Sequence, residues 1–161
     1  MISLTWRLVT QDDLASKAIQ YISAGRASHV GLILPGGFEL GARFDKAGGK
    51  PPGVQIRPEA YAKFESETYL TQEVTEEQGS LCTSFLFQQL GKPYDWRAIV
   101  GFAVNRNWRD DDSWICSELQ AAAIEHAGIC HPLYLAANKI TPVGVALILS
   151  ALGANITQEH P

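Results

Sequence analysis

The most constraining feature of this chain is the way its two kinds of hydrophobic periodicity are divided along the sequence. Segments that alternate between apolar and polar residues lie before residue 75, interrupted by a helical segment at residues 12–25 and a short one at residues 58–63, and longer segments with helical spacing follow. Alternation predicts strands with one face on a core, and apolar residues three and four apart predict helices. A helix and a group of strands followed by further helices predict an α+β fold.

The expected elements follow from these patterns and from the turn residues between them. Strands are expected at residues 4–9, 30–34, 38–44, 54–57 and 69–74. The turn at residues 35–37 (PGG) makes the second and third strands a hairpin. Helices are expected at residues 12–25, 58–63, 75–90, 94–104, 116–127 and 141–152. Residues 45–53 are rich in glycine and proline and are expected to form a surface loop.

The composition is that of a globular protein, and it bounds the class of partner. The 161 residues are 46% hydrophobic and 19% charged, which predicts one domain, residues 1–161, with its own core. The net charge is -4, and lysine and arginine form no cluster that could follow a phosphate backbone. Nucleic acid is therefore not expected as a partner.

Cysteine usage and the N-terminal residues predict the compartment. The three cysteines, Cys82, Cys116 and Cys130, are odd in number and irregularly spaced, which favours a reducing environment. The first residues lack the basic and then apolar order of a signal peptide, and the longest apolar run is too short to span a bilayer. We expect a cytoplasmic protein with no integral membrane segment, and a phage-encoded origin stays open. The oligomeric state is not indicated.

Cys116 stands where a polar loop ends and the helical pattern of residues 116–127 begins. Backbone N–H groups are unpaired in the first turn of a helix, and the helix dipole is positive there. A thiol at this position is expected to favour the thiolate, which is the nucleophilic form. The alternative is that Cys116 is a small buried apolar residue, as most cysteines are.

A base and an acceptor that orients it would complete a nucleophilic site. His29 begins the second expected strand, and imidazole transfers protons efficiently near neutral pH. Glu39 lies on the partner strand of the hairpin, and a bulge at Gly36 and Gly37 would place it on the same face as His29. The alternatives are a strand-edge histidine held by its neighbours and a glutamate exposed to solvent.

Two other chemistries fit the sequence poorly. A structural zinc site would need ligands from Cys116, His126, Cys130 and His131, yet no Cys-x-x-Cys pair exists. Ser113 and Ser117 lack the Gly-x-Ser-x-Gly turn of serine hydrolases. No metal and no organic cofactor are expected.

Four blocks stand in a definite order along the chain: residues 28–32 (SHVGL), Glu39, residues 91–96 (GKPYDW) and residues 114–119 (WICSEL). Together they resemble the circularly permuted branch of the NlpC-type cysteine hydrolases, the YiiX/YebB-like proteins of the papain-like superfamily. Unpermuted members carry the cysteine helix before the histidine strand, whereas the histidine comes first here. The resemblance spans residues 4–142, and the order and separation of the His and Cys blocks are its most specific part.

The resemblance implies roles for four residues and a fold. It implies Cys116 as the nucleophile, His29 as the base, Glu39 as the residue that orients His29, and Tyr94 as a supporting or substrate-binding residue. For Tyr94 a core aromatic is the alternative. The implied fold is a small antiparallel, partly barrel-like sheet with the cysteine helix packed against it. The long loop at residues 43–53 departs from the family pattern and leaves the substrate open.

We therefore interpret the chain as a cysteine hydrolase or acyltransferase that cleaves an amide, peptide or ester bond through a thioester acyl-enzyme. Peptides, peptidoglycan fragments and lipid esters are the substrate classes left open. The alternative from another class is a non-catalytic binding or assembly module, of phage origin for example, that keeps the fold without turnover.

Overall fold

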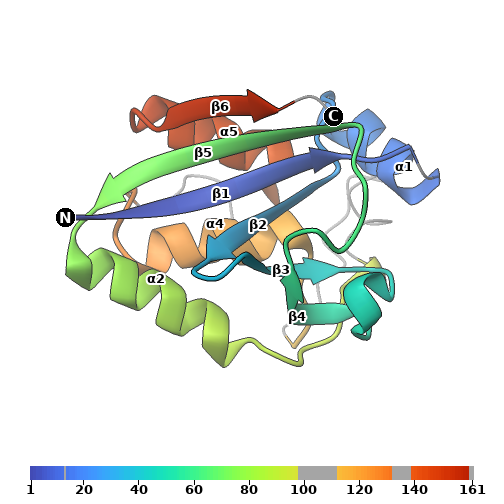
Figure 1. Ribbon diagram of the computed structural model, residues 1–161, viewed down its shortest axis with the longest axis horizontal. Helices are drawn as coiled ribbons and strands as arrows, with labels where there is room; N and C mark the ends of the chain where they lie inside the picture. Colours follow the sequence, from blue (N-terminus) through green and yellow to red (C-terminus); the bar gives the residue numbers. More distant parts are fainter. Residues whose placement is uncertain (13, 98–111, 132–138, 160–161) are drawn as a thin grey trace.

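The computed structural model describes residues 1–12, 14–97, 112–131 and 139–159, and their strands form one antiparallel sheet (Figure 1). The six strands lie in the order β4-β3-β2-β1-β5-β6. Because β4 and β6 are separate edges, this sheet is open and does not close into a barrel. The bounds are β1 Ile2–Thr10, β2 His29–Leu34, β3 Phe38–Arg43, β4 Gly53–Pro58, β5 Ser66–Val74 and β6 Asn155–Glu159.

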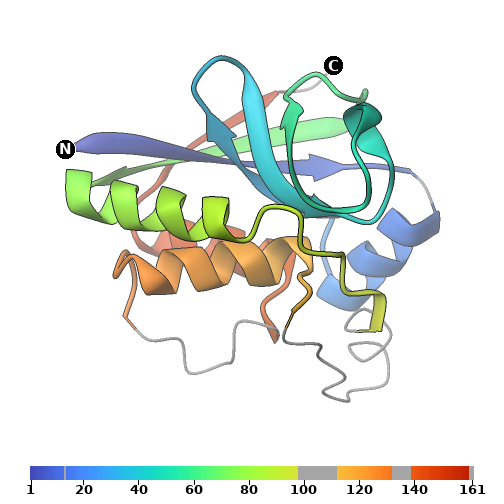
Figure 2. The ribbon, with the colours of Figure 1, turned by 90° about the horizontal axis from the view of Figure 1, so that it is seen from below.

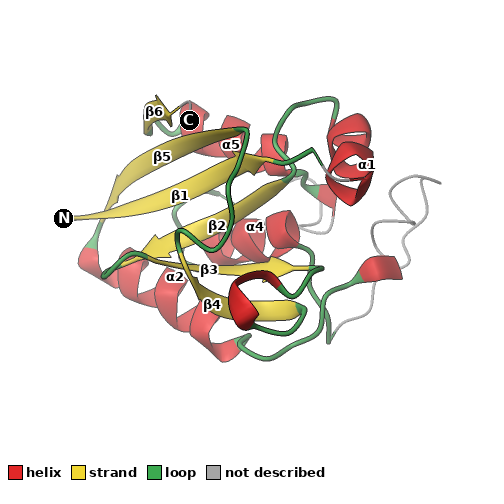
Figure 3. Ribbon diagram, turned by 45° about the vertical axis from the view of Figure 1, so that its right-hand side comes forward, coloured by secondary structure: helices red, strands yellow, loops and turns green. Residues whose placement is uncertain are grey.

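Helices α2, α4 and α5 lie against one face of the sheet, so the architecture is α+β, as the sequence predicted (Figure 3). Helices α2 and α4 run side by side beneath the strands (Figure 2), and α4 also contacts β2, β3 and α5. The helices are α1 Leu14–Ser23, the 3-10 turn η1 Ala47–Gly49, α2 Glu76–Gln88, α4 Cys116–His126 and α5 Pro142–Ala151. None of these helices is long and apolar enough to cross a membrane.

The face of the sheet that meets the helices is apolar. Trp6 on β1 pairs with Leu32 on β2 and Leu70 on β5, and all three side chains are buried. The Trp6 indole N–H donates to Gln120 Oε1 on α4 at 3.0 Å, and Gln120 Nε2 donates to the Leu40 carbonyl at 3.1 Å. These bonds satisfy the polar groups of the core and fix α4 against the central strands.

The opposite face of the sheet is polar around Arg7, and this part of the face is buried. Residues 59–65, between β4 and β5, lie over it, and the centroids of the Tyr61 and Phe64 rings lie 5.5 and 5.0 Å from the central carbon of the Arg7 guanidinium. Arginine stacks well on aromatic rings, so this cover excludes water without leaving the cation unpartnered. The polar side chains at most 4% exposed on this face are Arg7, His29, Glu39, Arg43 and Arg57.

One sequence-based expectation is contradicted by this fold, one strand was not predicted, and one expected helix is mostly untested. The helix expected at residues 58–63 is wrong: Pro58 ends β4, and turns and bends follow. The edge strand β6 was not predicted. The helix expected at residues 94–104 lies mostly outside the described residues. The other expected strands and helices are confirmed to within a few residues at each end.

Candidate active site

The β2–β3 hairpin brings His29 and Glu39 to the same face of the sheet. Ile33 pairs with Glu39 across the three-residue turn at residues 35–37. Directly opposite residues in an antiparallel pair share a face, and so do residues two and four apart along a strand. His29, four residues before Ile33, therefore shares the face of Glu39. The register alone produces this arrangement, without the bulge that the sequence suggested.

Two glycines leave room for the His29 ring to reach Glu39. A methyl group on Gly31 would lie 2.6 Å from Glu39 Oε1, and one on Gly41 would lie 3.3 Å from His29 Cε1. With both positions open, His29 Nε2 lies 2.6 Å from Glu39 Oε1, which is a short hydrogen bond. The pair thus depends on the absence of side chains at two neighbouring positions.

The protonation states of this pair follow from burial and charge. Burial lowers the pKa of His29 below its ordinary value, although the Glu39 carboxylate acts in the opposite direction. Burial would raise the pKa of Glu39, but His29 and Arg7 together bring it below its ordinary value. At neutral pH a neutral ring therefore lies beside an ionised carboxylate. The His29 Nε2–H donates to Glu39, and Nδ1 carries the free lone pair.

Cys116 is the first residue of α4 and is 3% exposed. The ladder between β2 and β3 ends at Leu32 and Leu40, so the start of β2 is unpaired on its β3 side. There the backbone N–H of Val30 faces the Cys116 sulfur. The thiol therefore lies against the residue that follows His29 in β2. No side-chain hydrogen bond joins Cys116 to His29 among the described residues.

The environment of the Cys116 thiol is electrostatically mixed. Burial raises the pKa of this thiol above its ordinary value, whereas the backbone N–H groups of Val30 and Ser117 and the charge of Arg43 lower it. The expectation that the helix start favours the thiolate is therefore wrong for the free protein. The backbone groups act in the expected direction, but burial is the larger effect. A protonated thiol at neutral pH requires a base before it can act as a nucleophile.

Backbone pairing places Tyr94 beside the start of α4. Tyr94 forms a parallel bridge with Trp114, two residues before Cys116. The Trp114 N–H donates to the Pro93 carbonyl, and the Asp95 N–H donates to the Trp114 carbonyl, each at 3.1 Å. The segment that the sequence linked to the site is thus fixed next to the helix that begins with Cys116.

The Tyr94 ring is buried and belongs to an aromatic cluster. Its centroid lies 6.1 Å from that of Phe44 and 5.6 Å from that of Trp96, both in edge-on geometry. Burial and the nearness of Cys116 raise the pKa of Tyr94 well above its ordinary value. The hydroxyl therefore keeps its proton, and Tyr94 serves as a packing group beside the thiol. Trp96 is 49% exposed and extends the cluster to the surface.

Arg7 lies on the same face as the pair, and the sequence did not predict it as a site residue. The Arg7 Nε donates to Glu39 Oε2 at 2.8 Å, and the terminal nitrogen Nη2 of Arg7 lies 2.5 Å from the same oxygen. The alternation of β1 assigned Arg7 to a polar side of the strand, where solvent exposure is the ordinary expectation. Only the segment that covers this face makes Arg7 an interior residue, and no local pattern in one sequence signals that.

The residues considered as zinc ligands do not converge with Cys116. His126 is the last residue of α4, at the opposite end of the helix, where its ring packs 5.0 Å from that of Phe85. In the part of the chain that the structure describes, no group of three or more His, Cys, Asp or Glu residues could hold a metal ion. Cys116 and His126 therefore cannot bind one zinc ion.

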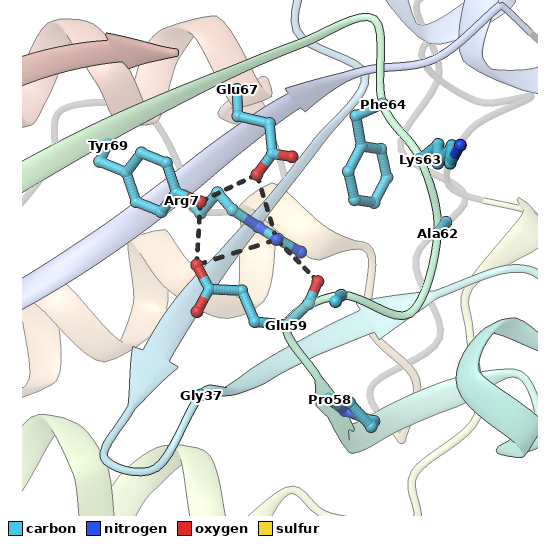
Figure 4. A pocket seen from close by; sticks show the side chains of 10 residues that line it. Arg7, Gly37, Pro58, Glu59, Ala62, Lys63, Phe64, Glu67 and Tyr69 are labelled. Atoms are coloured by element: carbon cyan, nitrogen blue, oxygen red, sulfur yellow. Dashed lines mark hydrogen bonds and ion pairs between the residues drawn. The ribbon is translucent and has the colours of Figure 1, made fainter. Parts of the chain in front are cut away.

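A pocket of about 820 Å³ lies over Arg7 (Figure 4). The Tyr69 hydroxyl stands there between two carboxylates, 2.9 Å from Glu59 Oε1 and 2.9 Å from Glu67 Oε2. Arg7 Nη1 donates to the same Glu67 oxygen at 3.2 Å. His29 and Cys116 are not among the lining residues, so this pocket is separate from the candidate active site.

Comparison with known proteins bears on the fold. No family model and no curated protein matches the chain. Among solved structures, the chain is similar to the crystal structure of the metalloprotein yiiX from Escherichia coli O157:H7, with 20% sequence identity and a TM-score of 0.51. The match covers 76% of this chain and 64% of that one, so the chain spans less than two thirds of that protein's length. The shared fold agrees with the YiiX-like resemblance of the sequence blocks.

Proposed function

We propose that the protein is a cysteine hydrolase or acyltransferase that acts on an amide, peptide or ester bond. Cys116 is the nucleophile, His29 the base, and Glu39 the acceptor that orients His29. The observation that carries this proposal is the 2.6 Å contact between His29 Nε2 and Glu39 Oε1. His29 is followed in β2 by Val30, whose backbone N–H faces the Cys116 sulfur. Nucleophile, base and orienting acceptor in series are the recurring parts of such enzymes.

The first step follows from the protonation states. Neutral His29 takes the proton of the Cys116 thiol on Nδ1 while the sulfur attacks the carbonyl carbon of the substrate. Ionised Glu39 accepts the Nε2–H and stabilises the imidazolium that forms. Because burial raises the pKa of the thiol, the thiolate forms during the attack and is not present beforehand.

The later steps return every group to its starting state. The backbone N–H of Cys116 supports the tetrahedral oxyanion at the start of α4. The bond to the leaving group breaks as that group takes the proton from His29 Nδ1, and a thioester remains. Water then gives a proton to His29 and attacks the thioester, and the departing sulfur recovers the proton. In acyl transfer an alcohol or amine takes the place of water.

The yiiX protein is described as a metalloprotein, but no metal is part of this proposal. Glu39 Oε2 is held by the Arg7 guanidinium, and Oε1 is held by His29. Both carboxylate oxygens therefore already have N–H partners, one of them a cation, and a divalent ion would compete with both. These residues do not fit a metal site, so no step is assigned to a metal.

A non-catalytic binding or assembly module is the second candidate. The observation that favours it is the burial of Cys116, which is 3% exposed and has a raised thiol pKa. A structural cysteine has both properties. The two candidates differ in whether the reactivity of the thiol depends on His29.

The test measures alkylation of Cys116 by iodoacetamide in a variant that lacks the other two thiols, Cys82→Ala with Cys130→Ala. In this background we expect His29→Ala to lower the alkylation rate at least about tenfold, since a positioned base contributes that much or more. The matched control is His126→Ala, at the other end of the same helix, which should leave the rate unchanged. An equal rate with and without His29 would favour the non-catalytic module.

A second readout follows the acyl-enzyme itself. Incubation with p-nitrophenyl acetate should add one acetyl group to Cys116, detected by intact mass, and hydroxylamine should remove it because a thioester is labile to that reagent. Acetylation that appears on Cys116 in the parent variant but not in His29→Ala supports the proposed steps. Acetylation of lysines alone argues against them.

A further inference from the structure

Arg7 holds the oxygen of Glu39 that His29 does not use. Its Nε donates to Glu39 Oε2 at 2.8 Å, and its Nη2 lies 2.5 Å from the same oxygen. The side chains of Arg7 and Glu39 are 1% and 3% exposed, so water does not screen this ion pair. The Glu39 carboxylate therefore bridges two partners, with Oε2 on Arg7 and Oε1 on His29.

The guanidinium of Arg7 is itself fixed in place. Its third nitrogen, Nη1, donates to the Glu59 carbonyl at 2.8 Å and to Glu67 Oε2 at 3.2 Å (Figure 4). The Tyr61 and Phe64 rings of residues 59–65 pack against it, with centroids 5.5 and 5.0 Å from its central carbon. A planar guanidinium held in this way directs both Nε and Nη2 toward the same carboxylate oxygen. A flexible ammonium group has no such fixed pair of donors. The orientation of the Glu39 carboxylate therefore depends on Arg7.

We propose that Arg7 is a positioning residue of the active site, which keeps Glu39 ionised and aims its Oε1 at His29 Nε2. The inference rests on the proposed function, because it assigns Arg7 to the same group of residues. Arg7 touches neither Cys116 nor the reacting atoms, and it acts through Glu39. It belongs to β1, and its backbone pairs with Gly31, the glycine over which the His29–Glu39 contact forms.

Arg7 and Glu39 act on His29 in opposite directions. Burial lowers the pKa of His29 most, the Glu39 carboxylate raises it, and the Arg7 guanidinium lowers it. The other charged groups near the ring are Arg43 and Asp45, which the variants below leave in place. Removing the Arg7 charge is expected to raise the pKa of His29, and removing the Glu39 charge to lower it. A loss of fold stability alone would not produce shifts of opposite sign.

The experiment uses the full chain with Cys82→Ala and Cys130→Ala and compares Arg7→Met with Glu39→Gln. The pKa of His29 is measured by NMR titration of its ring, and the rate of Cys116 alkylation is measured across pH. In Arg7→Met we expect the His29 pKa to rise, the alkylation profile to move to higher pH, and its plateau to fall about tenfold. In Glu39→Gln the pKa should fall. Glu73→Gln removes a carboxylate of β5 that accepts from the Ser3 hydroxyl and is not an ion-pair partner of Arg7; it is the matched control and should change neither readout.

Each outcome decides the inference. A His29 pKa that Arg7→Met leaves unchanged, or moves in the same direction as Glu39→Gln, overturns it. If Arg7→Met does not fold, Arg7→Lys carries the test. It keeps the charge without the fork, so the plateau should fall while the pKa stays near that of the parent. A plateau equal to the parent's in Arg7→Lys also overturns it.

The NMR titration separates this inference from the proposed function. If alkylation of Cys116 proves independent of His29, the proposed function fails. The ring titration still reads the link from Arg7 through Glu39 to His29, because it does not require Cys116 to react. Opposite shifts in that titration would then support the positioning contact by itself, and their absence would overturn it.

Discussion

Gly31 of β2 lies directly against the Glu39 carboxylate of β3, because a methyl group on Gly31 would stand 2.6 Å from Glu39 Oε1. Glu39 reaches His29 only because residue 31 has no side chain. We predict that Gly31→Ala destabilises the protein by about 1–3 kcal/mol through overpacking. It should also slow alkylation of Cys116, because Glu39 must turn away from His29. Chemical denaturation and the alkylation rate measure the two effects.

A double-mutant cycle identifies the collision as the cause. The atoms that the new methyl group would strike are all beyond Cβ of Glu39. Glu39→Ala removes them, so Gly31→Ala should cost less stability in that background than in the parent protein. An equal cost in both backgrounds would show that strain at residue 31 itself, and not Glu39, causes the loss.

Cys82 and Cys130 should differ in how readily iodoacetamide labels them. Cys82 is fully buried, and burial raises the pKa of its thiol to about 12. We predict that iodoacetamide labels Cys82 only after unfolding in guanidinium. Cys130 is partly exposed, and burial and Glu125 raise its thiol pKa, so it should label slowly in the native protein and equally in His29→Ala. Peptide mass spectrometry of native and unfolded samples gives the order, and native labelling of Cys82 would contradict it.

The strands and helices that contact the core were predictable from periodicity, and β6 was not. β1 to β5 each present an apolar side to the core, so their alternation carries a signal. β6 pairs only with β5 at an open edge, and its Ile156 is 57% exposed. Without a core to face, its residues need not alternate. Residues 58–63 were mispredicted as helix because Arg7 and Arg43 hold Glu59 and Tyr61 through contacts distant in sequence.

The candidate site was predictable where it depends on local spacing. The positions of His29 and Glu39 on either side of a three-residue turn determine that they share a face. Arg7 lies on another strand, and its role depends on a segment that folds over the sheet. The sign of the Cys116 pKa shift was also missed, because the helix start is visible in the sequence whereas the burial that outweighs it is not.

The lowered pKa of His29 makes stability depend on pH. The unfolded chain binds a proton at an ordinary histidine pKa of 6.5, whereas folded His29 binds it only at lower pH. Stability should therefore be fullest above pH 6.5 and fall as the pH drops below it. The lowered pKa of Glu39 adds a second loss below its ordinary value of 4.5.

Urea unfolding from pH 8 to pH 4 measures this dependence. The first loss, which begins near pH 6.5, should be absent in His29→Gln and retained in His126→Gln. The second loss should be reduced in Glu39→Gln. A parent protein whose urea midpoint stays constant between pH 7 and pH 5 would contradict the assignment of a neutral His29 to the folded state.

Arg43 and Asp45 should tune the reactivity of Cys116 in opposite directions. Arg43 is 2% exposed and forms two hydrogen bonds with Asp45, at 2.7 and 2.8 Å. Its charge lowers the pKa of both Cys116 and His29. Arg43→Gln should therefore raise both pKa values and move the alkylation profile to higher pH. Asp45→Asn leaves the guanidinium unneutralised and should move the profile to lower pH. Arg43→Lys keeps the charge, so its alkylation profile should lie close to that of the parent. Shifts of the same sign in Arg43→Gln and Asp45→Asn would show that lost packing, and not charge, governs the reactivity of the thiol.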